Sequence, residues 1–550
     1  MGKNTVVTRR DFLKSSGIVA LSLSTGLRPT ETLAADTPAR GGSLIWGVET
    51  EPTTLNPHLN GQAKAKLVLR NAYECLLARS ADGGYVPWLA KDYAVSEDGR
   101  TYTFNLRDDV NFSDGEKFDA AAVVTNFLKL KEPIYSGSIS AGHVSHISEA
   151  VARDAHTVVL TLKDVYAPFL DGATSIEIIS PKSFSSPQLK PGGPEIAGTG
   201  PFILDRYIKG QEARFVRNAA YQWAPANAGH QGPAYLDEVI YRFLPESAVR
   251  TGALSSGQVH VIEGISGNDA ALFRDNPDFT YQSALNTGTP YTLYLNVTNA
   301  PTSDVKIRKA FLAAIDVERI IQSVYRGERK RAWGVLTPAD TDFYDKSIEG
   351  RYGFDIDLAN RLLDEAGWTS RDGDGFRTKD GKRLTIEIVQ SQATLRDQRD
   401  VLLEAVQAQA RQNAGIDIVL RYVDAGTYSN RQSDGQYGII PNSTTTQENG
   451  LTLYFHYLPR AKGGSINYSR TEAADISAWL AEAASTLDAK RRFEIYSKLQ
   501  HFALLDQALG LPLYVPDDQI AATVAVQGAG FRPFKRLPEN AYDIWLQQQS

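Results

Sequence analysis

The chain has 550 residues, of which 42% are hydrophobic and 22% are charged, and its formal net charge is −6 at pH 7. This length is too great for one hydrophobic core, so we expect two or three domains of an ordinary soluble protein. The negative charge argues against nucleic acid or an anionic membrane as the main partner, because both repel an acidic surface.

The first 34 residues are predicted to be an export signal. The sequence TRRDFLK at residues 8–14 matches a twin-arginine motif, and the apolar run Ile18–Leu27 is too short to span a membrane. Thr32-Leu33-Ala34 supplies small residues for cleavage, so a mature chain that starts near Ala35 has a formal charge of −9. The alternative is a chance pair of arginines in a disordered tail.

Cysteine usage agrees with export. The only cysteine is Cys75, so no disulfide can form within the chain. It lies in an apolar helical pattern at residues 71–77, where we expect a buried and inert thiol. Because no cysteine stands at the cleavage site, we expect a free periplasmic protein rather than a lipoprotein.

The first predicted elements are two strands and a helix. Residues 43–48 read as a strand and lead into a proline-broken segment with the sequence LNPHL at 55–59. Residues 101–107 alternate between aromatic or apolar and polar side chains, which predicts a half-buried strand. A helix is expected after Asp119, which is a good N-cap residue.

A hairpin is predicted next, with strands at 202–207 and 213–217 after the sequence GTGPF at 198–202. The glycines do not form a phosphate loop, because no Lys-Ser/Thr ending and no helix follow them. A strand at 235–243 and a short helix at 247–255 complete this part.

His143 and His146 stand three residues apart, a spacing that would place both on one face of a helix and allow them to hold a metal. No third ligand stands nearby, and the preceding glycines and serines favour a loop. We therefore expect no metal site here.

The second half of the chain alternates predicted helices and strands. The helices are expected at residues 305–315, 358–366, 401–413 and 491–505, and the strands at 291–296 and 416–420. This alternation indicates an α/β lobe with partly parallel strand pairing. Residues 511–516 are expected to return the chain to the first lobe.

Several of these stretches resemble a known family. PWLA at residues 87–90, SEDG at 96–99 and the strand that follows resemble the signature of the large extracytoplasmic solute-binding proteins of ABC importers. The branch that they resemble is family 5, which contains oligopeptide-, dipeptide- and nickel-chelate-binding proteins. The resemblance covers nearly the whole mature chain, and it implies an α/β, two-lobed periplasmic-binding-protein fold of the type II-like, large cluster C form.

The resemblance also implies domain boundaries, with an extra subdomain in the first lobe. The expected order is a signal peptide at 1–34, a first-lobe core at 35–60, 190–285 and 509–550, an extra subdomain at 61–189, and a second lobe at 286–508. The chain should therefore cross between the lobes near residues 286 and 508.

The implied function is that of the periplasmic substrate-binding component of an ABC importer. Such a protein captures a small peptide or peptide-like solute between its lobes and delivers it to a membrane permease, which cytoplasmic ATPase subunits drive. A nickel chelate, an oligosaccharide or an opine-like compound remains an alternative solute. We expect a monomer that uses no cofactor and binds no nucleic acid.

A secreted hydrolase is the alternative of another class. The chain contains no His-Glu-x-x-His, no Gly-x-Ser-x-Gly, no phosphate loop and no cysteine–zinc spacing. The sequence therefore favours a binding protein over an enzyme.

Residues 437–458 are predicted to set solute specificity. Peptide-binding members of the family commonly use an acidic residue here to receive the ligand's α-ammonium, and the nearest match is Glu448. Asn442, Thr445 and Gln447 offer neutral hydrogen-bonding groups that suit hydroxyls or amides. A polar surface loop remains the alternative.

Two further residues are expected to line the same cleft. His58 lies in the family-like LNPHL segment, and Trp333 begins a loop that resembles a family loop opening on the cleft. A solvated histidine and a tryptophan packed in the lobe core are the alternatives. The histidine of the nickel branch is missing after Glu448, so we do not expect free nickel to be the ligand.

Overall fold

The computed structural model describes residues 37–80, 83–136, 138–339, 342–445, 449–462, 464–531 and 540–547. Every described helix and strand belongs to the unit Ala39–Ser550. The predicted export signal at 1–34 lies outside the described residues. In the part of the chain that is described, no helix has the length and apolar character that crossing a membrane requires.

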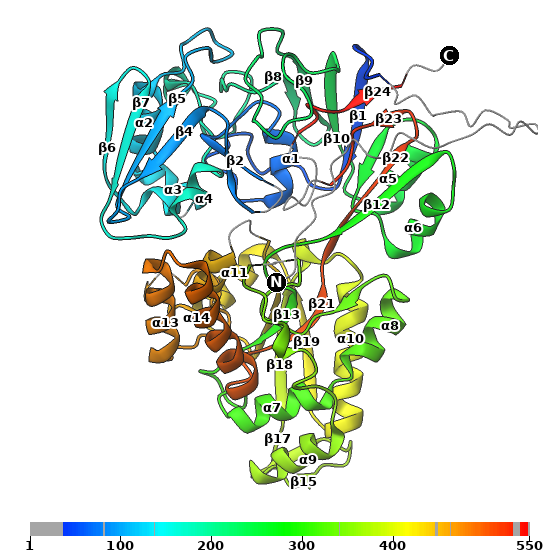
Figure 1. Ribbon diagram of the computed structural model, residues 1–550. Coiled ribbons are helices and arrows are strands. Elements are labelled where there is room, and N and C mark those ends of the chain that lie inside the picture. Colours follow the sequence, from blue (N-terminus) through cyan, green and yellow to red (C-terminus); the bar gives the residue numbers. More distant parts are fainter. Residues whose placement is uncertain are drawn as a thin grey trace, which may run out of the picture. The chain divides into compact units, whose positions relative to one another are not determined.

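The first lobe is built on a seven-stranded sheet with the order β12-β22-β11-β1-β10-β9-β8 (Figure 1). Its strands are β1 Ser43–Val48, β8 Phe202–Ile208, β9 Glu212–Arg217, β10 Glu238–Phe243, β11 Val261–Glu263, β12 Phe279–Leu285 and β22 Asp517–Thr523. β1 pairs in parallel with β10 and β11, and the other neighbours are antiparallel. Helices α5 (Ser247–Ser255) and α6 (Gly267–Arg274) bury Leu254 and Phe273 in a hydrophobic cluster that includes β22.

The extra subdomain has a four-stranded antiparallel sheet with the order β4-β5-β7-β6. Its elements are β4 Ala90–Val95, β5 Thr101–Leu106, α2 Ala120–Lys129, α3 Ile139–Val144, β6 Ile147–Asp154, β7 Thr157–Leu162 and α4 Phe169–Ala173. The predicted strand is confirmed, because alternate residues of β5 are buried. The predicted cap is confirmed too, since the Asp119 carboxylate accepts a hydrogen bond of 2.8 Å from the backbone N–H of Ala122.

Short elements connect this subdomain to the seven-stranded sheet. They are α1 Lys66–Leu69, β2 Leu77–Arg79 and β3 Tyr85–Pro87, with β23 Val526–Gln527 and β24 Trp545–Leu546 near the end of the chain. One continuous hydrophobic core runs through the subdomain and the sheet, so the two form a single lobe.

The second lobe has a six-stranded mixed sheet with the order β14-β21-β13-β20-β18-β19. The strands are β13 Tyr291–Leu295, β14 Lys330–Arg331, β18 Thr385–Ser391, β19 Asp417–Val423, β20 Ile439–Asn442 and β21 Gly510–Val515, and a small sheet contains β15 Ser370–Arg371, β16 Arg377–Lys379 and β17 Lys382–Arg383. β18 pairs in parallel with β19 and β20, as the alternation of helices and strands predicts.

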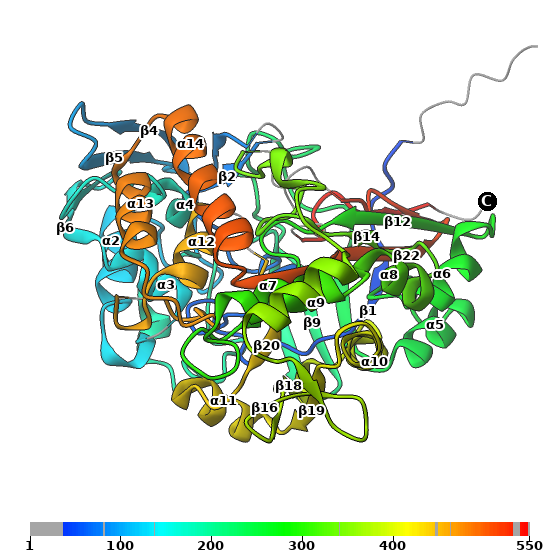
Figure 2. The same ribbon diagram turned by 90° about the horizontal axis from the view of Figure 1, so that it is seen from below.

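Eight helices are described in the second lobe. They are α7 Val305–Ala314, α8 Val317–Tyr325, α9 Ile356–Glu365, α10 Arg399–Gln409, α11 Ala425–Asp434, α12 Asn449–Tyr457, α13 Ala474–Ser485 and α14 Ala489–His501. They surround two hydrophobic clusters, one containing Leu402 and Ile388 and the other containing Leu480 and Ile495. Figure 2 shows α13 and α14 side by side along one flank of this lobe.

The chain crosses between the lobes twice, after β12 and after β21 (Figure 1). The two crossings lie together, because the backbone N–H of Asn286 donates a 2.9 Å hydrogen bond to the carbonyl of Pro516. The first crossing follows β12, which ends at Leu285, and the sequence placed it near residue 286. The second crossing follows β21, which pairs with β13 in the second sheet and ends at Val515, whereas the sequence placed it near 508.

The lobes also touch away from the crossings. The backbone N–H of Ala167, in the extra subdomain, donates a 2.8 Å hydrogen bond to the carbonyl of Ala484 in α13. Leu451 and Ala484 of the second lobe pack against the hydrophobic core of the first. Contacts on both sides therefore hold the two lobes against each other.

Candidate functional site

The carboxyl ends of the parallel strands of both sheets lie at the edges that the crossings join. In the second lobe, β18 and β20 end at Ser391 and Asn442, on the same edge from which β21 leaves. In the first lobe, β1 and β11 end at Val48 and Glu263, on the edge where β22 begins. In α/β proteins, ligands bind outside the carboxyl ends of parallel strands. The facing edges are therefore the candidate site.

An ionic cluster occupies these edges. Its members are Glu49, Lys64, Arg250, Glu263 and Asp518 from the first lobe, Arg329, Arg396, Asp397 and Arg399 from the second, and Asp517 beside the second crossing. Opposite charges from both lobes thus stand where the sheets approach each other.

The first-lobe half of the cluster is centred on Lys64. Its ammonium forms an ion pair with Glu49 and lies 4.0 Å from Oε2 of Glu263. Burial acts to raise the pKa of Glu49, but Lys64 and Arg396 hold that pKa below its usual value. Burial raises the pKa of Glu263, which is only 2% exposed. The positive charge of Lys64 is therefore in direct contact with the carboxylate of Glu49 but lies 4.0 Å from that of Glu263.

The second-lobe half of the ionic cluster is centred on the turn that precedes α10. Arg399, at the start of the helix, is buried, donates a 3.1 Å hydrogen bond from Nε to the Tyr514 hydroxyl and lies 4.2 Å from the ring centre of Tyr291. Asp397 lies 3.4 Å from Arg329 and 3.7 Å from Arg399. Although burial acts to raise it, the pKa of Asp397 falls to about 2, mainly because of these two arginines.

Two predicted residues, Asn442 and Thr445, lie on this edge. Asn442 ends β20, and the next residue, Ser443, accepts a 3.2 Å hydrogen bond from Arg399. Thr444 exchanges two 2.8 Å hydrogen bonds with Thr289 beside the first crossing. Both Asn442 and Thr445 are half-buried. The other two predicted residues of this segment, Gln447 and Glu448, lie outside the described residues.

His58 lies in the core of the first lobe. Its side chain is 1% exposed, its Nε2 lies 2.6 Å from the carbonyl oxygen of Glu177, and its ring stacks 6.0 Å from Phe184. Burial lowers the pKa of His58, which favours a neutral ring. Among the described residues, no hydrogen bond or ring contact joins His58 to Asn442 or Thr445, so this packing favours a structural role.

Trp333 is half-buried beside the edge strand β14. The guanidinium carbon of Arg331 lies 3.7 Å from the centre of the indole ring, and Tyr352 meets the ring edge-on at 5.7 Å. The Tyr352 hydroxyl donates a 2.7 Å hydrogen bond to the Trp333 carbonyl. No described contact connects Trp333 to Asn442 or Thr445. Thr337, four residues further on, is the part of this loop that reaches the first crossing, at Gly288.

The histidine pair is not arranged as the sequence suggested. His143 lies in the helix α3 rather than in a loop, and it is buried against Gly172. His146 stacks on Tyr166 with 3.7 Å between the ring centres. In the described part of the chain, no three histidine, cysteine, aspartate or glutamate side chains gather as a metal site would require.

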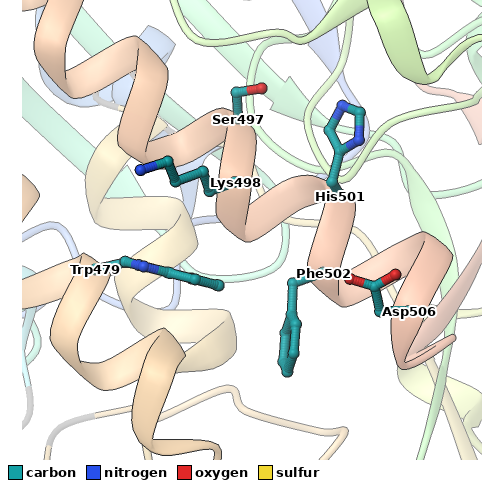
Figure 3. Close-up of a pocket in the computed structure, with 6 residues that line it drawn as sticks. All are labelled: Trp479, Ser497, Lys498, His501, Phe502 and Asp506. Carbon is teal, nitrogen blue, oxygen red and sulfur yellow. The ribbon is translucent and has the colours of Figure 1, made fainter.

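A separate open pocket of about 410 Å³ lies on α13 and α14 (Figure 3). Trp479 and Phe502 meet edge-on at 5.6 Å, and Ser497, Lys498, His501 and Asp506 complete the lining. His501 lies 3.0 Å from the Asp345 carboxylate, which also accepts a hydrogen bond from Ser497. This pocket uses none of the strand ends described above.

Sequence reasoning missed the cations of the site. Arg396 and Arg399 stand in a sequence that reads as the polar start of the helix predicted at 401–413, and Lys64 stands in an unassigned stretch. The only local signal was the pair of arginines around Asp397. Tyr291 and Tyr514, which enclose Arg399, are far away in the sequence.

Known proteins share this architecture. A family model described as bacterial extracellular solute-binding proteins, family 5 Middle, matches residues 84–464. The nickel-binding periplasmic protein of Escherichia coli K12 is 31% identical over 413 residues, which cover 73% of this chain and 75% of that protein. The glutathione-binding protein GsiB of the same strain is 28% identical over 375 residues, covering 66% and 67%.

A solved structure agrees with these relatives. NikA from Brucella suis, in complex with Fe(III)-EDTA, matches with a TM-score of 0.76 and 27% identity, over 90% of this chain and 99% of that one. The expected two-lobed fold is thereby confirmed. The chain belongs to family 5 of the bacterial extracellular solute-binding proteins, the two-lobed proteins that bind solutes for ABC transporters.

Proposed function

We propose that this protein captures a small peptide or peptide-like solute between its lobes and delivers it to an ABC permease in the inner membrane. The observation that carries the proposal is the ionic cluster on the facing strand ends, where Glu49 and Lys64 of one lobe face Arg396 and Asp397 of the other. A peptide with free ends carries one charge of each sign. A site with both signs therefore suits such a solute.

The comparisons support a solute of this kind. One relative binds glutathione, which is a tripeptide, and shares 28% identity over two thirds of each chain. Binding between the lobes favours the closed form by the difference in solute affinity between the open and closed forms. The closed form then presents both lobes to the permease, and ATPase subunits drive transport. The protein itself breaks no covalent bond of the solute and acts as a monomer.

A nickel chelate is the second candidate. A nickel-binding relative is 31% identical, and a neighbouring structure holds Fe(III)-EDTA. Because the described residues offer no cluster of metal ligands, a nickel ion would enter inside a chelator that supplies those ligands. Tight calorimetric binding of bare Ni²⁺ by the mature protein would contradict this restriction.

The test is a binding screen with unliganded mature protein. Thermal shifts followed by titration calorimetry should be recorded for short peptides, carboxylate chelates of nickel, opine-like compounds and neutral oligosaccharides. We expect at least one peptide to bind with micromolar or tighter affinity. No binding in any class would overturn the proposed function.

Export by the twin-arginine pathway is part of the proposal, and it rests on Arg9 and Arg10 with the cleavage residues before Ala35. Replacing both arginines by lysine should trap the precursor in the cytoplasm. Fractionation that finds a normal periplasmic yield of the double variant would argue for another export route.

A further inference from the structure

Three carboxylates gather at the strand ends of the first lobe, and we call them the acidic end of the candidate site. Glu49 directly follows β1, Glu263 is the last residue of β11, and Asp518 is the second residue of β22. Glu263 and Asp518 are only 2% and 5% exposed. Burial raises the pKa of Glu263, and the nearby Glu49 and Asp518 raise it further. Enclosed carboxylates that repel one another need a compensating positive charge.

The chain itself supplies that charge. Lys64 belongs to the short 3-10 helix Ala63–Ala65, and its side chain is 13% exposed. Its ammonium forms an ion pair with Glu49 and lies 4.0 Å from Oε2 of Glu263. Although burial acts to lower it, the three carboxylates hold the pKa of Lys64 above its ordinary value. Lys64 is therefore a charged ammonium ion enclosed by the acidic end.

Glu263 depends on this ammonium. Its Oε1 accepts a 3.2 Å hydrogen bond from the backbone N–H of Glu49, whereas its Oε2 is buried and accepts no hydrogen bond from the described residues. Arg250, the other cation of this half of the cluster, donates to four backbone carbonyls. Lys64 is thus the described cation within ion-pair distance of the unbonded oxygen.

The Lys64 ammonium also faces the second lobe. The pKa of Asp397, which burial acts to raise, is lowered by its neighbouring arginines and also by Lys64 of the other lobe. Lys64, Arg396 and Arg250 together lower the pKa of Glu49 against burial. Three cations therefore stand against the three carboxylates of the acidic end. Their charges balance without a solute, at a place to which carboxylates would otherwise draw the ammonium of a solute.

We propose that Lys64 is a built-in ammonium that occupies the acidic end of the solute site, so that the first lobe selects against a solute cation there. This inference rests on the proposed function and narrows its solute class to compounds whose amine is bound elsewhere in the site. A second ammonium beside Lys64 would meet a like charge and find every carboxylate already compensated. Diamines and peptides that direct a basic side chain to the first lobe are the solutes that should be rejected.

The first experiment replaces the ammonium of Lys64 by one from solution. Lys64→Ala removes the charge and leaves space for a small ion. Thermal unfolding of the mature protein without solute is recorded in ethylammonium chloride and in equal concentrations of sodium chloride and of tetramethylammonium chloride, whose cation has no N–H donor. Lys91→Ala is the matched control, because Lys91 pairs with Asp108 at 2.9 Å on the surface of the same lobe. The double variant Lys64→Ala/Glu263→Gln removes one charge of each sign.

We expect ethylammonium to restore about half or more of the unfolding midpoint that Lys64→Ala loses, because the ion binds only the folded variant. It should act no differently from sodium on the wild type, on Lys91→Ala and on the double variant. If Lys64→Ala does not fold in sodium chloride, refolding in ethylammonium alone is the expected result. Equal responses of Lys64→Ala and Lys91→Ala, or equal effects of ethylammonium and tetramethylammonium on Lys64→Ala, would overturn the ammonium site.

The second experiment tests solute selection by titration calorimetry. Peptides that bind in the screen are compared in two forms, with norleucine or lysine at each position in turn, because the two side chains differ in a terminal methyl or ammonium group. We expect the wild type to bind the norleucine form at least tenfold more tightly at one or more positions, and Lys64→Ala to lose or reverse this preference.

Equal affinities at every position in the wild type, or a preference that is unchanged in Lys64→Ala, would overturn the role of Lys64 in selection and leave the proposed function standing. A wild-type protein that binds no peptide and no other compound of the screen would overturn the proposed function. The ethylammonium experiment needs no solute, so it tests the ammonium site in either case.

Discussion

Two carboxyl groups, those of the buried Glu74 and the half-buried Asp397, are stabilised in opposite ways. Glu74 lies in the core of the first lobe and accepts hydrogen bonds from the neutral groups of Trp88, Tyr221, Thr199 and Trp223, at 2.6–3.2 Å. Asp397 is surrounded by positive charges from both lobes. Burial raises the pKa of Glu74 to about 8, although its four hydrogen bonds act to lower that pKa. The cations around Asp397 lower its pKa to about 2.

The difference separates a structural centre from the proposed binding site. The two oxygens of Glu74 accept four hydrogen bonds from protein groups, so no capacity remains for a ligand. Its partners all belong to one lobe. The cluster around Asp397 joins both lobes, and among the described residues Arg396 makes only a 3.8 Å ion pair with Asp397. We therefore expect changes at Glu74 to act on stability and changes in the ionic cluster to act on solute binding.

The largest expected effect is that of Glu74→Ala. The change leaves the buried donors of Trp88, Tyr221 and Thr199 without this acceptor, while Trp223 keeps its 2.9 Å hydrogen bond to the Thr199 carbonyl. Each donor that is left unpaired costs about 1–3 kcal/mol. The free energy of unfolding, measured with urea, should fall by about 5 kcal/mol or more. Glu132→Ala, which removes an exposed carboxylate, is the control and should change it little. A Glu74→Ala protein as stable as the control would show that Glu74 does not organise the core.

The second prediction concerns pH. The folded-state pKa of Glu74, about 8, exceeds the ordinary value of 4.5, so the folded protein holds this proton more tightly than the unfolded chain. The resulting stability is complete below pH 4.5 and is lost as pH rises to about 8. Between pH 5 and 8.5 the wild type should lose up to about 4 kcal/mol more than Glu74→Gln. Parallel pH profiles for the two proteins would contradict this.

Asp397→Asn should have an intermediate effect on the free energy of unfolding. The lowered pKa means that Arg329 and Arg399 stabilise the charged carboxylate, and losing this attraction should cost about 1–2 kcal/mol at pH 7. The contribution is present above the ordinary pKa of 3.8 and is lost as pH falls through about 2. Because Arg396 of the same turn belongs to the proposed site, solute affinity should fall as well. Unchanged stability and unchanged solute affinity at pH 7 would show that Asp397 does not contribute to the proposed site.

The smallest expected effect on stability is that of Glu448→Ala. If this residue receives a cationic amine, its removal should weaken binding of a peptide at least tenfold, with little change in unfolding. The matched control is the same peptide with an acetylated amine, which should bind the variant and the wild type equally. An unchanged affinity for the free peptide would indicate that the segment is a surface loop.

Local patterns predicted the elements well. The alternation at Thr101–Leu106 and the capping aspartate before α2 involve neighbouring residues only, and both are present. The second crossing lies later in the chain than the expected 508, because residues 510–515 look like a strand of either sheet. Their place is decided by pairing with β13, more than two hundred residues earlier in the chain.

The site was predicted only in part for the same reason. Asn442 and Thr445 were predicted as neutral hydrogen-bonding groups of the segment 437–458, and the structure adds that Asn442 ends β20. A histidine in a proline-broken loop looks solvated, but Tyr135 and Phe184, which are distant in sequence, enclose His58. Likewise, nothing near Arg399 shows that Tyr291 and Tyr514 bury it.

The most direct test is a crystal structure of the mature protein with the peptide that binds most tightly in the screen. The account predicts the peptide between the ends of β1 and β11 on one side and of β18 and β20 on the other, with the Lys64 ammonium still between Glu49 and Glu263. A peptide bound in the pocket of Trp479 and His501, or a peptide amine bound to Glu263 in the place of Lys64, would contradict it.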